Sequence, residues 1–292
     1  MKKLLLFTAA VMIAFTSCKK DDDNGGGGGD DIGPVPAAFT QKVLIEEFTG
    51  CWCGYCPDGA TIVDETMTQF PGQVYGAAIH QGDPMEISLY DKLDQKFNVT
   101  GFPTGMVNRT AQGGSVPMSR GAWKNAAQGI LNGNALAGVA IKSSVEAGVI
   151  SVEVHTGFAA PVAGNFRVTA YVIEDGVTGG GSYNQSNYMN NDASSPWYQM
   201  GNPIVGFEHN HTVRKVLSAN LGDLVEASAQ VALGEDVKVY STAIPLNAQG
   251  LPKWDTSKVK IIAFVHRDGG SATNSEIVNV QKATLGTVKN WD

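Results

Sequence analysis

Hydrophobic and polar positions alternate along residues 42–133 in a way that predicts strands and helices in turn. The predicted strands cover residues 43–49, 73–80 and 104–108, and the predicted helices cover residues 54–70, 87–97 and 119–131. Residues 73–80 are largely apolar, which predicts a strand buried on both faces. The first helix is expected to end at Pro71-Gly72, a pair that breaks helices. Strands that alternate with helices predict a sheet covered by helices.

The pattern changes after residue 133. Short apolar or alternating stretches, separated by Gly, Asn and Asp, cover residues 139–144, 149–156, 165–173, 237–244 and 258–267. Their spacing predicts an antiparallel β-sandwich of the immunoglobulin-like type. We therefore expect an α/β domain over residues 39–133 and an all-β domain over residues 134–292.

The first residues have the pattern of a targeting signal. Two lysines precede an apolar run from Leu4 to Phe15, which is too short for an ordinary transmembrane helix. Small residues then lead to Cys18. A signal that ends in this way resembles that of bacterial lipoproteins, in which the cysteine becomes the lipidated first residue. We expect residues 1–17 to be removed and Cys18 to carry the lipid anchor.

Residues 18–38 are expected to form a flexible tether. Lysines and aspartates follow Cys18 directly, and five consecutive glycines come next, so the segment can bury nothing. A Lys/Asp-rich segment at this position resembles the surface-export signal of lipoproteins from one phylum of gut and oral Gram-negative anaerobes. A plain linker on a periplasm-facing protein is the alternative. Either location is extracytoplasmic and permits disulfides.

Composition and charge exclude one class of partner. The 292 residues are 43% hydrophobic, as in a globular chain long enough for two domains. The net charge is −7, and no Lys/Arg cluster follows residue 20. A nucleic-acid partner is therefore not expected.

Two cysteines at the start of the first predicted helix carry the candidate chemistry. The run Cys53-Gly54-Tyr55-Cys56 comes shortly after the strand at residues 43–49. Unpaired N–H groups at a helix N-terminus stabilise a thiolate and lower its pKa. A second thiol nearby resolves the mixed disulfide that the thiolate forms. The pattern predicts thiol–disulfide exchange.

The residues around these cysteines resemble the active-site segment of the thioredoxin superfamily. In that pattern a buried acid lies six residues before the first active cysteine, and a tryptophan lies immediately before it; Glu47 and Trp52 occupy these positions. Further along, Gly101-Phe102-Pro103-Thr104 resembles the loop whose cis proline lies against the disulfide. Three matching elements in this order are more specific than a Cys-x-x-Cys pair alone.

This resemblance assigns roles to the matching residues. Cys53 is the expected nucleophile, and Cys56, one turn inside the helix, is the expected resolving thiol. Glu47 is expected to lie beneath them, to have a raised pKa through desolvation and to move a proton. Pro103 cannot donate a ladder hydrogen bond, which leaves its neighbour's backbone free to pair with an extended substrate. The expected groove side chains are Trp52, Tyr55, Phe102 and Thr104. No cofactor is expected beyond the redox-active disulfide and the lipid on Cys18.

Other uses of the cysteines stay open. A structural zinc site needs two ligands besides a Cys-x-x-Cys pair, and Cys51 and His80 are the nearby candidates. An inert structural disulfide is the more serious alternative. Cys51 is a third thiol once Cys18 is lipidated. It can pair with another chain, act as an alternative resolving thiol, or be a tolerated spare.

Two further features lie in the second half. On a strand, His209 and His211 would point to one face, which makes them a weak candidate metal site or a tie between the domains. The segment 176–206 is rich in Gly, Ser and Asn and carries the aromatic residues Tyr183, Tyr188, Trp197 and Tyr198. This composition is typical of binding surfaces. A merely packed or disordered loop is the alternative.

Three stretches of the chain resemble a family of lipoproteins. Residues 43–50, 53–60 and 209–214 look like those of the proteins related to the 28-kilodalton outer membrane protein of the same anaerobe phylum. The resemblance implies a thioredoxin-like domain, a carboxy-terminal β-sandwich and an outer-membrane location. The founding member is described as a surface protein and candidate adhesin, so the resemblance brings no established reaction.

We therefore expect a lipid-anchored outer-membrane protein at the cell surface. Its leading expected activity is thiol–disulfide exchange with extracytoplasmic proteins or with a redox partner. The alternative is a non-enzymatic adhesin, in which the cysteines form only a structural disulfide and the aromatic segment binds a host ligand.

Overall fold

The computed structural model describes residues 31–292 except residues 220 and 252. The predicted signal, the lipidation site Cys18 and most of the tether lie outside the described residues. The α-helices are α1 (Cys56–Gln69), α2 (Leu89–Phe97) and α3 (Trp123–Leu131). None of the helices in the described part of the chain is long and apolar enough to cross a membrane.

The strands of the first half are β1 (Val43–Thr49), β2 (Val74–His80), β3 (Thr104–Val107) and β4 (Met118–Ser119). The strands of the second half are β5 (Gly138–Glu146), β6 (Val149–Phe158), β7 (Phe166–Glu174), β8 (Thr212–Val216), β9 (Asp223–Leu224), β10 (Gly234–Ala243), β11 (Val259–Arg267), β12 (Ile277–Thr284) and β13 (Val288–Lys289). Short 3-10 turns lie at Arg120–Ala122, Gly181–Tyr183, Ala227–Ala229 and Ala272–Asn274.

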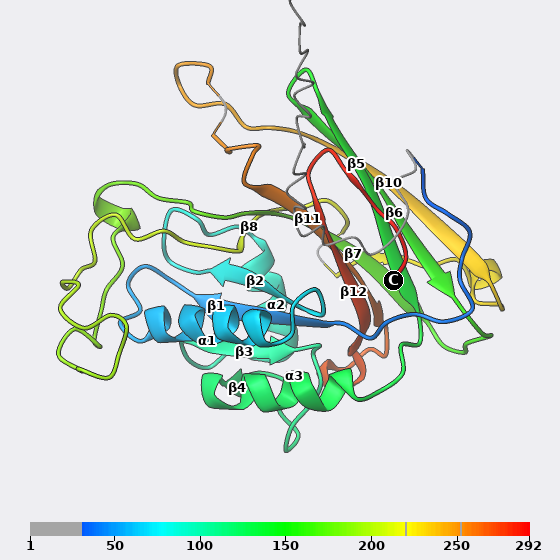
Figure 1. Cartoon of the computed structure of the whole chain (residues 1–292), viewed down its shortest axis with the longest axis horizontal. Coiled ribbons are helices and arrows are strands. Elements are labelled where there is room, and N and C mark those ends of the chain that lie inside the picture. The colour runs from blue at the N-terminus through cyan, green and yellow to red at the C-terminus, as the bar shows by residue number, and fades with distance from the viewer. Residues whose placement is uncertain (1–30, 220, 252) are drawn as a thin grey trace, which may run out of the picture.

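These strands form two sheets among the described residues. The larger sheet has the order β12-β11-β7-β8-β2-β1-β3-β4, with β9 beside β7, and the smaller has the order β10-β6-β5-β13. β1 runs parallel to β2, and β2 runs parallel to β8 where Ala78 pairs with Thr212. The chain is therefore a mixed α/β sheet with β-α-β units plus a separate, small antiparallel sheet (Figure 1).

Helices cover both faces of the parallel part of the large sheet. α1 and α3 share one buried cluster with β1, in which Trp123 is the largest side chain. α2 covers the opposite face with Leu89, Leu93 and Phe97. β1 and β2 are buried along their whole length, which is the reason for their long apolar runs.

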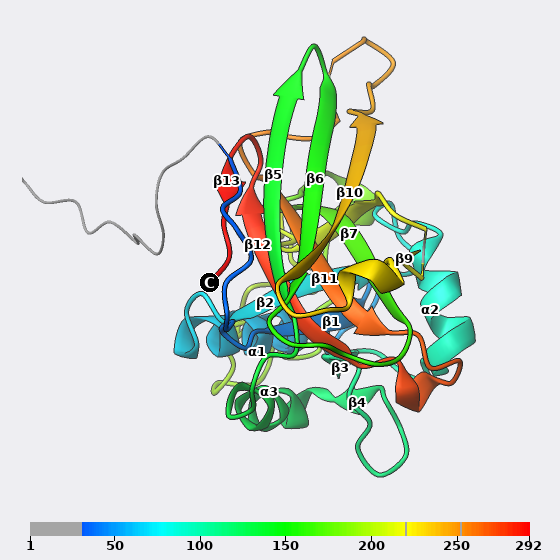
Figure 2. The ribbon, with the colours of Figure 1, turned by 90° about the vertical axis from the view of Figure 1, so that its right-hand side faces the viewer.

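The antiparallel strands predicted after residue 133 are divided between the two sheets. β5 and β6 belong to the small sheet, whereas β7 and β11 belong to the large one. The two sheets pack face to face around Val152, Phe158, Val168 and Ile261 (Figure 2). Because β8 lies between β7 and β2, strands from both sides of the predicted boundary at residue 133 share one sheet. This topology does not by itself identify the second half as immunoglobulin-like.

A buried ion pair also joins the two halves. Arg109, just after β3, donates two hydrogen bonds to Glu46 on β1, at 2.7 and 2.8 Å. The hydroxyl of Tyr171 on β7 donates to the same carboxylate at 3.0 Å. All three side chains are within 1% of full burial, so the charges depend on each other for compensation.

Candidate functional site

The two cysteines of the Cys-x-x-Cys motif lie in the turn between β1 and α1. Their sulfur atoms form a disulfide, and their Cα atoms are 5.4 Å apart. The Cys56 N–H donates to the Cys53 carbonyl at 3.2 Å, and α1 begins at Cys56 itself. Cys53 thus precedes the helix and Cys56 starts it, instead of lying one turn inside. Pro57 suits the first helical turn because it has no N–H group that needs a partner.

The carboxyl group of Glu47 is buried below this turn. The residue is 4% exposed, and its Oε1 atom has no hydrogen-bond partner among the described residues. Burial raises the pKa of Glu47 to about 8, with the charge of His211 opposing the rise and that of Asp64 adding to it. A Cβ atom built on Gly59 would lie 2.4 Å from Glu47 Oε1. The absence of a side chain at Gly59 therefore lets α1 approach the carboxyl group.

The Gly-Phe-Pro-Thr loop lies on the same side of α1. The Phe102–Pro103 peptide bond is cis, and Pro103 Cβ is 3.0 Å from the Cβ position built on Gly59. The Phe102 ring packs on that of Trp52, with ring centres 5.1 Å apart. Thr104 starts β3 and pairs with both Phe48 and Ser119. The structure thus places Thr104 in the sheet and Phe102 beside the cysteine turn.

Part of the segment 176–206 folds over the cysteine turn. The Gln185 side-chain amide donates to the carbonyls of Gly50, Cys51 and Cys53 at 3.2, 3.2 and 2.8 Å. The Tyr188 N–H donates to the Gly54 carbonyl at 2.8 Å. Cys53 is consequently only 4% exposed. Nothing in the sequence around Gln185 signals this contact, since the residues it joins are more than a hundred positions apart.

Aromatic side chains surround the covered disulfide. Trp52 and Tyr55 are each 47% exposed, and Tyr188 is 62% exposed. The rings of Tyr55 and Tyr188 meet edge to face, with centres 5.3 Å apart. Of the predicted groove residues, Tyr55 therefore shares a surface with the segment 176–206, which in Figure 1 lies beyond the start of α1, whereas Trp52 packs on Phe102.

The structure does not place His209 and His211 on one face of a strand, and their side chains have different partners. β8 begins only at Thr212, and His211 has a positive φ of 56°, so the period of a strand does not apply to them. His211 Nε2 contacts Asp64 of α1 at 2.9 Å and its Nδ1 contacts Asp175 at 3.1 Å. His209 turns towards Cys51 instead, with 3.6 Å between its Nε2 and the sulfur.

A small polar cavity connects these groups. Its volume is about 20 Å³, and its lining includes Glu47, Cys56, His80 and His209. A space of this size holds about one water molecule. The buried carboxyl and the second cysteine thus face a common space through which one water can relay a proton.

The comparison with known families decides the identity of the chain. Residues 90–289 match the family described as Outer membrane protein Omp28. The chain belongs to this family. Membership of this family confirms the predicted outer-membrane location. The lipid on Cys18 and exposure at the cell surface stay predictions.

One solved structure supports the fold of this Omp28 protein. It resembles HBP35 of Porphyromonas gingivalis with a TM-score of 0.65 and 22% sequence identity, over 85% of this chain and 76% of that one. A domain of the outer membrane lipoprotein Omp28 from Porphyromonas gingivalis is also similar, with a TM-score of 0.33 and 14% identity, over 54% of this chain and 92% of that one. Among curated proteins, none matches the sequence.

Proposed function

We propose that this Omp28 protein exchanges thiols and disulfides with extracytoplasmic proteins through Cys53 and Cys56. The observation that carries the proposal is the pairing of a disulfide at the start of α1 with a buried, unpaired carboxyl, Glu47. A purely structural staple does not need a titratable group of this kind beneath it. Raised pKa values near neutrality, produced by burial, are typical of proton-transfer groups.

The exchange step uses the disulfide as it stands. A substrate thiolate attacks Cys53 Sγ, the Cys53–Cys56 bond breaks, and Cys56 leaves as a thiolate. Glu47, protonated below its pKa of about 8, supplies a proton to that thiolate through the shared cavity. A second substrate thiolate then attacks the substrate sulfur of the mixed disulfide and releases Cys53. The substrate gains a disulfide and the protein gains two thiols; the reverse sequence reduces a substrate.

Access to Cys53 requires the segment around Gln185 to move. The hydrogen bonds of Gln185 and Tyr188 to the cysteine turn leave too little exposed surface for a protein substrate to reach the sulfur. Surface segments can open locally at a free-energy cost below that of global unfolding. We therefore propose that a substrate displaces this segment and occupies the groove formed by Trp52, Tyr55 and Phe102.

Insulin reduction and refolding of a scrambled disulfide protein test the proposal. The wild type should show both activities, and Cys53→Ser should abolish them. Cys56→Ser should accumulate the mixed disulfide, because the resolving thiol is missing. Equal activity of wild type and Cys53→Ser would refute exchange at this site, and a native state whose disulfide resists reduction would favour a structural staple.

The finer fold assignment belongs to the same proposal. We propose that residues 39–133 form a thioredoxin-like unit and residues 134–292 an immunoglobulin-like one. The β1-α1-β2 arrangement, the position of the disulfide and the cis proline support the first part. The two facing antiparallel layers support the second. Exposure at the cell surface, supported by the Lys/Asp-rich segment after Cys18, completes the proposal.

A second candidate function is binding of a host ligand by the aromatic surface. Its supporting observation is the pair of exposed rings, Tyr55 and Tyr188, that meet on one surface. Tyr188→Ala should then weaken adhesion of intact cells, whereas Cys53→Ser should leave adhesion unchanged. Val239→Ala, an exposed substitution on β10, is the matched control. Unchanged adhesion with Tyr188→Ala would exclude this surface as the adhesive one.

A further inference from the structure

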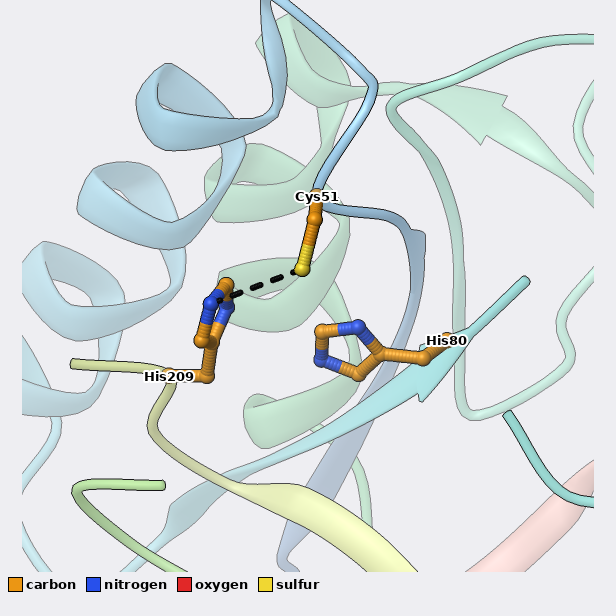
Figure 3. A group of neighbouring side chains, drawn as sticks. All are labelled: Cys51, His80 and His209. Carbon is orange, nitrogen blue, oxygen red and sulfur yellow. Dashed lines mark hydrogen bonds between the residues drawn. The ribbon is translucent and has the colours of Figure 1, made fainter. Parts of the chain in front are cut away.

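Three buried side chains with metal-binding atoms converge next to the disulfide. Cys51 follows β1, His80 ends β2, and His209 precedes β8. Each is at most 4% exposed, and the three candidate ligand atoms all lie within 4.8 Å of one another. Figure 3 shows the Cys51 sulfur and the His80 ring turned towards His209. We propose that these residues bind a transition-metal ion with affinity for sulfur and imidazole, Zn²⁺ or Cu⁺.

The spacing of one ligand pair already fits a metal centre. The distance between Cys51 Sγ and His209 Nε2 is 3.6 Å. A tetrahedral ion with bonds of about 2.3 Å to sulfur and about 2.0 Å to nitrogen holds these two atoms about 3.5 Å apart. The ligand atom of His80 lies within 4.8 Å of the other two, so it completes the set by an approach of at most about 1.5 Å to the spacing of ligands on a tetrahedral ion.

Asp83 orients two of the three ligands. Its carboxylate contacts His80 Nδ1 at 2.6 Å and accepts the backbone N–H of Cys51 at 2.9 Å. A carboxylate on one ring nitrogen fixes the histidine tautomer and directs the other nitrogen to a metal. The contact with Asp83 engages Nδ1 of His80, and the residue lines the small cavity.

His209 presents its Nε2 atom to both Cys51 and a backbone carbonyl. This atom lies 3.6 Å from the Cys51 sulfur and donates to the Tyr183 carbonyl at 2.9 Å. Coordination by Nε2 breaks this hydrogen bond, and the ring proton moves from Nε2 to Nδ1.

The donor set selects the class of metal. One thiolate and two imidazoles suit Zn²⁺ or Cu⁺, whereas Ca²⁺ and Mg²⁺ require oxygen ligands. Three protein ligands and the adjacent cavity of about 20 Å³ leave room for one water as the fourth ligand of Zn²⁺. Met85, which packs with Cys51, is a soft neighbour that favours Cu⁺ in the same place. On binding, the Cys51 S–H bond breaks, a sulfur–metal bond forms, and the proton passes to solvent without any change in oxidation state.

Metal binding gives a role to Cys51, which is the thiol outside the disulfide in the described chain. The proposal does not depend on whether Cys53 and Cys56 turn over.

Metal titration of the mature chain with its disulfide intact tests the site. With Co²⁺ as the spectroscopic probe, one equivalent should produce a thiolate-to-cobalt charge-transfer band and the intense d–d bands of a tetrahedral centre. Zn²⁺ should displace Co²⁺ stoichiometrically, and a competition with a Cu⁺ chelator ranks the two natural candidates. Cys51→Ser should remove the charge-transfer band. Asp83→Asn should weaken binding by about 10- to 100-fold.

The control is His155→Gln, a histidine outside the cluster whose loss should change nothing. The proposal would be overturned if Cys51→Ser bound all three metals with unchanged affinity. It would also be overturned if the wild type bound them no more tightly than free histidine in solution does. X-ray absorption of the loaded wild type needs no variant, and should show one sulfur and two imidazole ligands. A first shell without sulfur would also overturn the proposal. Insulin reduction is measured with the same variants. Loss of metal binding with unchanged insulin reduction is thereby distinguished from failure of the exchange reaction.

Discussion

Replacing the buried carboxyl of Glu47 should change how the stability of the protein depends on pH. Burial raises the pKa of Glu47 from 4.5 to about 8 in the folded chain. The folded state therefore keeps a proton that the unfolded state has lost between these two values. Because the folded state binds more protons there, the free energy of unfolding falls as pH rises through this window. The loss from Glu47 alone is about 3.5 kcal/mol between about pH 5 and pH 8.

Urea denaturation at the two ends of this window measures the effect. Glu47→Gln keeps a neutral group of the same size, so its free energy of unfolding should lack this loss and exceed that of the wild type at pH 8 by about 4 kcal/mol. The matched control is Glu65→Gln, at an exposed position of α1, which should retain the wild-type dependence. All measurements use the oxidised protein, so that the disulfide is constant. Parallel curves for the wild type and Glu47→Gln would refute the assignment of a protonated, buried Glu47.

Two other substitutions test the cover over the disulfide and the join between the halves. Gln185→Ala removes three hydrogen bonds to the cysteine turn and should destabilise the state in which the segment covers the disulfide by about 1.4 kcal/mol net. Reduction of the disulfide by dithiothreitol should therefore become about tenfold faster. Arg109→Ala leaves the Glu46 carboxylate buried without its partner and should lower the free energy of unfolding by about 3–5 kcal/mol.

Each of these substitutions has a control elsewhere in the chain. Gln199→Ala changes an exposed residue of the same segment and should leave the rate of reduction unchanged. Lys142→Ala breaks a solvent-exposed pair with Asp31 and should cost less than about 1 kcal/mol. Equal rates for Gln185→Ala and Gln199→Ala would mean that this segment does not control access. An Arg109→Ala effect as small as that of Lys142→Ala would contradict the role of the ion pair.

The sequence by itself determined the local elements and the position of the cysteines. β1 and β2 are buried on both faces, and the mostly apolar sequence of β2 expresses this directly, whereas β1 also buries Glu46 and Glu47. α1 ends one residue before the predicted limit, at Gln69, because Pro71-Gly72 cannot continue a helix. The position of the cysteine pair at the start of α1 followed from the local pattern, and the lipoprotein-like amino terminus required no tertiary information.

Strand β12 was missed because its polar positions are buried instead of exposed. Asn279 Oδ1 accepts the Lys42 N–H at 3.0 Å, and Gln281 Oε1 accepts from the Lys42 ammonium at 2.9 Å. Polar residues that satisfy buried groups of another strand carry no distinguishing signal in one sequence. β8 was missed because it too depends on segments far apart in the chain. It joins β2 through the pairing of Thr212 with Ala78.

Only the tertiary structure decided what surrounds the cysteines. Gln185 reaches Cys53 across 132 positions, and His209 reaches Cys51 across 158. Such contacts depend on where the large sheet brings its strands together, and not on the residues next to Gln185 or His209 in the sequence. The sequence therefore determined that a disulfide precedes α1, whereas the fold decided that Gln185 covers it, that Glu47 beneath it is protonated near neutral pH, and that Cys51 meets two imidazoles.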